Sequence, residues 1–145
     1  MYCSFRDIVN EIGEYRLIDY SNAGNRDADT VNEAFVNDRI DTAGTIIDSY
    51  IRGVADLPIS DEDDLRILRS LCITLTVTDL VSSDMDQGQP FDAIRARRKE
   101  AIGTLERYMR GELRLNSTTT KAAPAHFRSN SRQKAFTQDI IDRMI

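Results

Sequence analysis

The stretch that most constrains the fold is residues 61–83, where four consecutive acids are followed by LRILRSLCITLTVTDLVSS. Acids suit the first turn of a helix, because its N–H groups lack partners and its positive dipole end favours carboxylates. Ser60 precedes them as the predicted N-cap, with Asp63 three residues later as its capping-box partner. The rest of the stretch is apolar on most sides, as in the central helix of a bundle. The sequence therefore predicts an all-α fold built around this helix.

A metal site and a β-strand are the two alternatives for this stretch. A metal site in the acidic run needs converging ligands, whereas adjacent residues on a helix point about 100° apart. No histidine lies nearby, and no DxDxDG loop is present. The β-branched run CITLTVT has strand propensity, but the whole stretch is too long for an ordinary strand. We therefore expect a helix and no metal site.

Shorter helices are predicted at the N-terminus. Residues 5–12, FRDIVNEI, follow Ser4 as a cap, with Asp7 as its box partner and Gly13 as the terminator. A second short segment, EYRLIDY, comes next, and the polar stretch SNAGNRDAD then indicates a loop. The N-terminal part thus predicts a helical pair before the first long helix.

A long helix is predicted from Thr30 to Arg52. Its apolar residues repeat at steps of four and three. These are Val36, Ile40, Ala43, Ile47, Tyr50 and Val54. Glycine costs about 1 kcal/mol relative to alanine inside a helix, so Ala43 followed by Gly44 indicates a close crossing with another helix. Gly53 and Pro58 end the element.

The last helix of the body is predicted to begin at Pro90 and to end at Gly111. One face of this helix is apolar except for Arg98. The residues of the face are Phe91, Ile94, Arg98, Ala101, Leu105 and Tyr108. A basic cluster on this helix consists of Arg95, Arg97, Arg98 and Lys99. It is short, has acidic neighbours and lacks interleaved aromatics, which argues against nucleic-acid binding. A solvated face with ion pairs and a contact to an acidic neighbouring chain both remain open, and we name the cluster a candidate interface.

The C-terminal part differs from the body in composition. Residues 116–133 are polar and of low complexity, and residues 134–145, KAFTQDIIDRMI, form a short amphipathic pattern. A helix this short needs a surface to dock on. We predict a helical domain over 1–115 and an extended arm over 116–145 that ends in a helix at 134–145. The apolar face of that helix is a second candidate interface: Phe136, Ile140, Ile141 and Met144.

Charge and hydropathy argue against a nucleic-acid-binding, membrane-spanning or secreted protein. Residues 1–115 carry 14 bases and 22 acids, whereas 116–145 carry five bases and two acids. An acidic body argues against wrapping nucleic-acid phosphates. The apolar runs are too interrupted to span a bilayer, and the N-terminus lacks the basic start and apolar stretch of a signal peptide. We expect a soluble protein made in a cytoplasm, with no membrane partner.

The sequence contains no motif for catalysis. P-loop, GxSxG, HExxH and GxGxxG patterns are absent, and the single histidine, His126, has no partner within the polar linker. Cys72 sits in an apolar run and predicts a buried thiol. Cys3 has no CxxC partner, so neither cysteine is expected to be a metal ligand or half of a disulfide. We expect no enzyme, and no catalytic, cofactor or metal site.

Three stretches together resemble one family. The opening MYCSFRDIVNEIGEYRLIDYS resembles the MY-x4-DI-x4-GE-x2-LI start of the Mu-like head–tail connector proteins of tailed phages, also called head-completion or neck adaptor proteins. The stretches AGTIIDSYIRGVADLPI and EAIGTLERYMRGELRL are similar to later parts of the same family. The resemblance covers about residues 1–115, and its weight comes from the order of the stretches along the chain.

The resemblance implies a structural virion protein in the neck of a phage particle, made in the host cytoplasm. Its subunits would form a homo-oligomeric ring, dodecameric if it follows the portal, and complete the DNA channel after packaging. They would contact the portal protein on one side and a tail or second neck protein on the other, with DNA passing through without specific binding. The alternative function is a soluble helical binding or regulatory module that captures a partner with its C-terminal tail.

Overall fold

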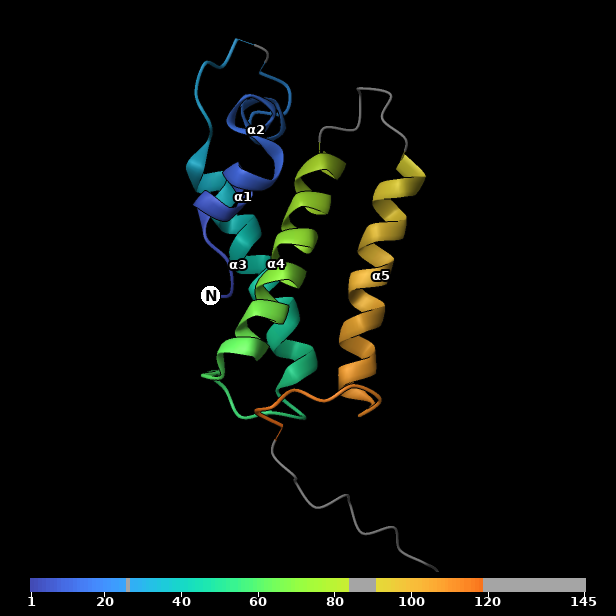
Figure 1. The fold of residues 1–145 in the computed structure, drawn as a ribbon. Helices are drawn as coiled ribbons and strands as arrows, with labels where there is room; N and C mark the ends of the chain where they lie inside the picture. The colour runs from blue at the N-terminus through green and yellow to red at the C-terminus, as the bar shows by residue number, and fades with distance from the viewer. Residues whose placement is uncertain (26, 84–90, 119–145) are drawn as a thin grey trace, which may run out of the picture.

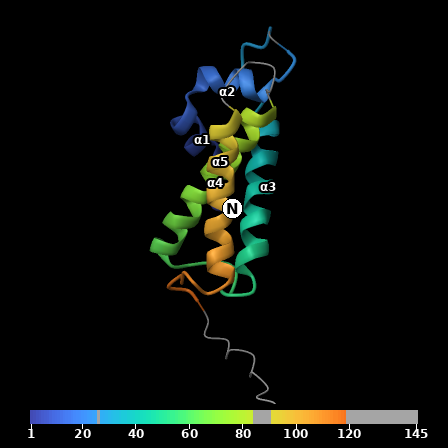
Figure 2. The same cartoon turned by 90° about the vertical axis from the view of Figure 1, so that its right-hand side faces the viewer.

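The computed structural model describes residues 1–25, 27–83 and 91–118, in which the regular elements are five helices and no strand. These are α1 (Phe5–Ile12), α2 (Glu14–Ser21), α3 (Glu33–Ile51), α4 (Glu62–Ser83) and α5 (Phe91–Met109). Helices α3 and α5 each run antiparallel to α4, and α1 and α2 cover one end of α3 and α4 (Figures 1 and 2). The predicted all-α bundle is confirmed.

Helix α4 is the centre of the bundle, as predicted. It contacts each of the other four helices, most extensively α3 and α5. The β-branched run CITLTVT lies within it and is helical throughout. Its buried residues point to more than one side: Asp64, Leu68, Cys72, Leu75, Thr76, Val77, Thr78 and Leu80. Because neighbours surround this helix, apolar residues are needed around most of its circumference.

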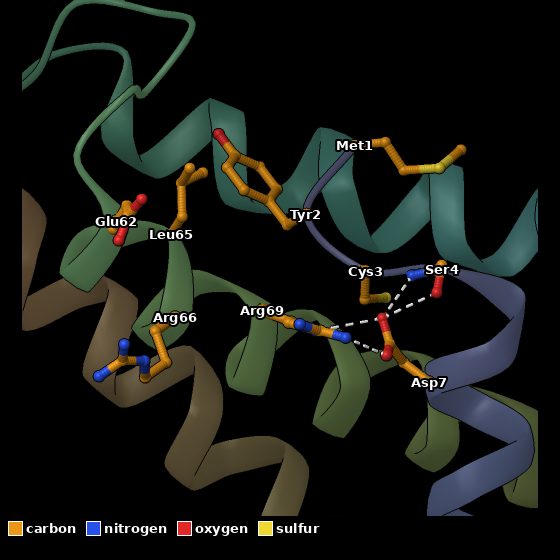
Figure 3. Close-up of a pocket in the computed structure, with 9 residues that line it drawn as sticks. All are labelled: Met1, Tyr2, Cys3, Ser4, Asp7, Glu62, Leu65, Arg66 and Arg69. Carbon is orange, nitrogen blue, oxygen red and sulfur yellow. Dashed lines mark hydrogen bonds and ion pairs between the residues drawn. The ribbon is translucent and has the colours of Figure 1, made fainter.

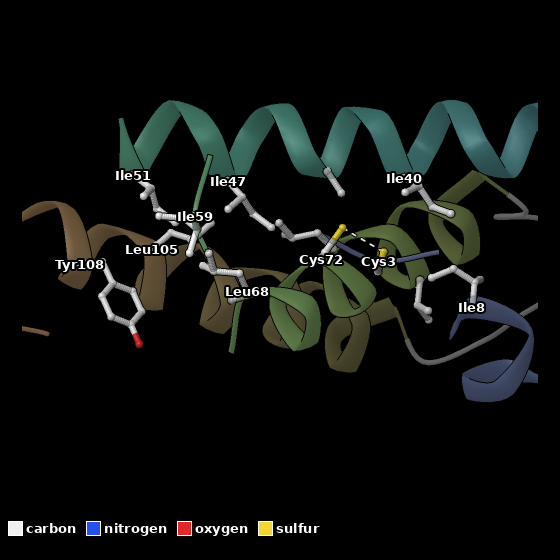
Figure 4. Packing of buried hydrophobic residues seen from close by; sticks show 14 of the residues in the cluster. Cys3, Ile8, Ile40, Ile47, Ile51, Ile59, Leu68, Cys72, Leu105 and Tyr108 are labelled. Carbon is white, nitrogen blue, oxygen red and sulfur yellow. Dashed lines mark hydrogen bonds between the residues drawn. The ribbon is translucent and has the colours of Figure 1, made fainter. Parts of the chain in front are cut away.

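The core is completed by one face each of α3 and α5 (Figure 4). From α3 it takes Val36, Ile40, Ala43, Ile47 and Ile51, and from α5 it takes Ala101, Leu105 and Tyr108. Burial of a large aliphatic side chain contributes about 1.5–3 kcal/mol to folding. The four- and three-residue spacing read from the sequence thus corresponds to real core faces, although Tyr50 and Val54 are only half-buried.

The first helix forms as its sequence predicts. The Ser4 backbone N–H and hydroxyl both donate to the Asp7 carboxylate, at 2.8 and 2.9 Å. Gly13 follows the helix with φ of 82°, a conformation that favours glycine. This turn lets α2 start at once in a new direction.

The long helix α3 departs from its prediction at two places. It begins at Glu33 and not at Thr30, because the Asn32 side chain caps it by accepting a bond from the Phe35 N–H at 3.1 Å. Gly44 is buried, yet a Cβ built there would meet no atom within 4 Å. Close packing therefore does not require a glycine at position 44.

The cap of α4 is also corrected. Asp61 accepts hydrogen bonds from the N–H groups of Asp63 and Asp64, at 3.1 and 3.0 Å. Its carbonyl accepts the bond from the Leu65 N–H at 3.0 Å. Asp61, the residue directly before the helix, is thus the N-cap in place of Ser60.

After α5, the chain turns at Gly111, which has φ of 73°, and crosses the end of the bundle (Figure 1). Leu115 is buried there, and Thr118 forms an isolated antiparallel bridge with Ala55 in the α3–α4 connection. The start of the predicted C-terminal arm, up to Thr118, is therefore in contact with the body. Pro90 and the side chain of Phe91 lie outside the described residues.

Candidate interaction surfaces

The basic residues predicted as one face on α5 are divided among different neighbours. Arg98 forms an ion pair with Asp79 of α4 at 3.4 Å, and Arg97 pairs with Glu11 of α1 at 3.9 Å. Arg95 and Lys99 are exposed. At least two members are therefore engaged within the chain, and Arg98 takes part in holding α5 to α4.

Asp79 joins three helices. Besides Arg98, it binds Arg39 of α3 at 3.3 Å, and the Arg39 guanidinium lies over the Phe35 ring, 4.7 Å from its centroid. The side chains of Arg39, Asp79 and Arg98 are 33%, 31% and 40% exposed. Partial burial limits screening of these charges by solvent, so the network helps to fix how the three long helices pack.

A cleft of about 580 Å³ lies between the N-terminal segment and α4 (Figure 3). On one wall, the Arg69 Nε donates to Asp7 at 3.1 Å, and a second Arg69 nitrogen binds the other carboxylate oxygen. This pairing lowers the pKa of Asp7 to about 2. The lining residues are Met1, Tyr2, Cys3, Ser4, Asp7, Glu62, Leu65, Arg66 and Arg69.

Tyr2 holds the same segment from the other side. Its hydroxyl donates to the Asp48 carboxylate of α3. Burial, together with this hydrogen bond, raises the pKa of Tyr2. The N-terminal residues are therefore tied to both long helices before α1 begins.

A smaller cleft of about 260 Å³ adjoins the first and brings together Arg66 and Arg69 of α4 with Arg97 of α5. Acids accompany these arginines: Glu11 lines the cleft, and Asp63 pairs with Arg66 at 3.5 Å. The result is a surface of mixed charge, which suits a protein partner with a complementary pattern. No sequence pattern predicts this surface, because the packing of α4 against α5 decides which arginines lie together.

Asp64 has a role that its position in the acidic run does not reveal. It is 2% exposed, and its carboxylate accepts the Asn116 N–H at 2.8 Å, the Ser117 N–H at 2.7 Å and the Ser117 hydroxyl at 2.6 Å. The Asn116 amide also donates to Asp61 at 3.1 Å. The first turn of α4 thus holds the chain where it leaves the bundle, and no local sequence signal indicates this pairing.

Cys3 and Cys72 meet in the core. The Cys3 thiol donates to the Cys72 sulfur at 2.9 Å, and both cysteines are free and buried (Figure 4). The predicted burial of Cys72 is confirmed. Their contact was not predicted, because 69 positions separate them in sequence.

The remaining sequence predictions concern metal ligands, membrane-spanning helices, His126 and the C-terminal apolar face. Within residues 1–25, 27–83 and 91–118, no group of three or more His, Cys, Asp or Glu side chains is placed to hold a metal ion. Over the same ranges, no helix combines the length and apolarity needed to cross a bilayer. His126 and the apolar face of the C-terminal segment, Phe136, Ile140, Ile141 and Met144, lie outside the described residues.

Comparison with known proteins places this all-helical bundle among bacteriophage proteins. The model of the family described as "Bacteriophage Mu, Gp36" matches residues 2–133. The chain belongs to this family. A search of curated proteins finds no match. The family match extends past residue 115 and so includes the whole polar segment 116–133.

Proposed function

We propose that this protein is a structural virion component that forms a ring between the portal and the tail and completes the DNA channel after packaging. The family match over residues 2–133 carries the proposal, since membership in a phage Mu family favours a structural or morphogenetic role. The resemblance of three ordered stretches to Mu-like connectors makes the role specific. The proposal includes no catalysis.

A closed ring requires each subunit to present two different surfaces, because its contacts are heterologous. The cleft lined by Arg66, Arg69 and Arg97 is proposed as one of them. Its mixed charges would pair with a neighbouring chain of complementary pattern, and such complementarity fixes register more than it adds affinity.

The exposed carboxylates of α3 supply a surface for the channel. Asp38 and Asp41 lie three residues apart on that helix, and both are exposed. Facing the channel, they would repel DNA phosphates and let the duplex pass without binding tightly.

The segment after Thr118 is proposed to reach a neighbouring subunit or ring. Asp64 holds residues 116 and 117 at the α3–α4 end of the bundle, which sets where this segment begins. Docking of residues 134–145 through Phe136, Ile140, Ile141 and Met144 would then link subunits, as the sequence pattern predicts.

The experiment that tests the function is quantitative mass spectrometry of purified particles of the source phage. Peptides of this chain are counted against those of the portal protein, with the portal-to-capsid ratio in the same digest as calibration. A count close to that of the portal supports a ring component. Absence from the particle, or a count far below that of the portal, overturns the proposal in favour of a soluble binding or regulatory module.

A further inference from the structure

The two cysteines bring their sulfurs close to bonding distance. Cys3 belongs to the segment before α1, whereas Cys72 lies in the middle of α4. Their sulfurs are 2.9 Å apart, and a disulfide bond measures about 2.05 Å. The two sulfurs therefore need to move closer by less than about 1 Å to form a disulfide bond.

Flanking contacts hold Cys3 in this position. On one side, the Tyr2 hydroxyl binds Asp48 of α3; on the other, Asp7 forms a two-point contact with Arg69 of α4. Both anchors lie within four residues of Cys3. They keep its sulfur beside Cys72, and this orientation favours an intramolecular reaction over reaction with a second chain.

Although both cysteines are buried, Cys3 lies at the wall of an open cleft. Cys3 is among the residues that line the 580 Å³ cleft (Figure 3), whereas Cys72 is fully buried. The hydrogen bond from Cys3 lowers the pKa of the Cys72 thiol and raises that of Cys3. Cys72 is therefore the more easily formed thiolate of the two.

We propose that Cys3 and Cys72 are an oxidisable dithiol site, which closes to an intramolecular disulfide when the protein meets a small disulfide of the glutathione class. Cys3, which lines the cleft, gives its thiol proton to the adjacent Cys72 thiolate as its sulfur attacks the small disulfide, so a mixed disulfide forms and one small thiolate leaves. Cys72 then gives that proton to the released thiolate, attacks the Cys3 sulfur and releases the second small thiolate. The two protein thiols lose two electrons and two protons, and the oxidant becomes two thiols.

The disulfide would tie the N-terminal segment to the central helix. It closes a loop that contains α1, α2 and α3, and such a long loop strongly restricts the unfolded chain. In a reducing cytoplasm the pair stays as thiols, and in an oxidising medium it closes. The protein would thus become more stable after release from a cell. This inference goes beyond the connector role and does not depend on it.

The test uses the reduced full-length protein, incubated with oxidised glutathione without denaturant. The expected result is a monomer lighter by two hydrogen atoms, with no free thiol after unfolding. Its Tm should rise by about 10 °C and return after treatment with dithiothreitol. Hydrogen exchange should slow in residues 3–12. The matched control is Cys3→Ser, which removes the outer thiol and should show no change in Tm with oxidant.

Three results would overturn the inference. They are a stable glutathione adduct on one cysteine, a disulfide-linked dimer as the main product, or two thiols unchanged at an oxidant level that oxidises free dithiothreitol. The wild-type protein alone distinguishes these results by mass, so the decision does not require that any variant folds. Particle composition, which tests the connector role, is measured separately.

Discussion

Ser117 donates two hydrogen bonds to the buried carboxylate of Asp64, from its backbone N–H at 2.7 Å and from its hydroxyl at 2.6 Å. The two residues are 53 positions apart. The contact joins the segment after α5 to the first turn of α4 and satisfies a carboxylate that is almost fully removed from solvent. It therefore links the end of the bundle to the start of its central helix.

Replacement of Asp64 should destabilise the protein. Asp64→Ala leaves three donors of residues 116 and 117 without their acceptor, and we expect a loss of about 2–3 kcal/mol in the free energy of unfolding. Urea denaturation measures this change. Glu62→Ala is the matched control, because Glu62 is an exposed acid in the same turn; it should cost less than about 0.5 kcal/mol. Equal effects of the two variants would show that the hydrogen bonds from residues 116 and 117 to Asp64 do not stabilise the fold.

Gly44→Ala should stabilise the protein by about 0.5–1 kcal/mol, since alanine has the higher helix propensity. The site has room, because an added Cβ meets no atom within 4 Å. The control is Gly13→Ala, where φ of 82° disfavours any side chain and a loss of about 1 kcal/mol is expected. Thermal and urea unfolding of both variants show whether each substitution raises or lowers the free energy of unfolding. A destabilised Gly44→Ala protein would show that this part of α3 is packed more tightly than the structure indicates.

The Asp7–Arg69 pair predicts a stability that depends on pH. Arg69 lowers the pKa of Asp7 to about 2, below an unfolded value near 3.9. The folded state therefore favours the carboxylate, so this contribution is complete above pH 4 and is lost as the pH falls toward 2. Because Arg69 is half-exposed, we expect the contribution to be about 1 kcal/mol.

Urea unfolding between pH 2 and pH 6 tests this prediction. Arg69→Met should flatten the part of the pH dependence that lies between pH 2 and pH 4. Arg66→Met is the control, because Arg66 pairs with the exposed Asp63 and should leave the profile almost unchanged. An identical flattening in both variants would point to net charge and not to the Asp7 pair.

Asp79 and Arg98 should be energetically coupled. In a double-mutant cycle, Asp79→Asn and Arg98→Met are expected to give a coupling of about 0.5–1 kcal/mol in unfolding free energy, because the pair is only partly exposed. Lys99→Met with Asp79→Asn is the matched cycle on the same helix, and its coupling should be near zero. A coupling as large for Lys99 would mean that the effect is long-range and not specific to the ion pair.

Removal of residues 134–145 should impair assembly and leave the bundle intact. The described bundle contacts involve residues up to Thr118, so the Tm should stay within about 2 °C of the full-length value. The yield of infectious particles should fall by about tenfold or more, because each ring would lose the docking contacts of several subunits at once. Substitution of Phe136 and Ile140 by Ser in the full-length chain should reproduce this loss. Normal assembly with the shortened chain would rule out the docking role.

Much of the fold follows from local sequence patterns. The capping box of Ser4 and Asp7, the glycine that ends α1 and the apolar circumference of α4 each involve residues a few positions apart, so the sequence alone predicts them. The errors are equally local. The sequence predicts that α3 begins at Thr30 and that Ser60 caps α4, whereas Asn32 and Asp61, one or two positions further on, are the caps in the structure.

The amino-acid sequence by itself determined the number of long helices and their core faces, because backbone periodicity and end caps depend on near neighbours. It also carried the resemblance to the phage family to which the chain belongs. Only the tertiary structure decided that Asp64 meets Ser117, that Asp79 joins Arg39 to Arg98, and that Cys3 faces Cys72. These contacts arise where packed helices bring distant segments together, and the distance along the chain conceals them from any local pattern.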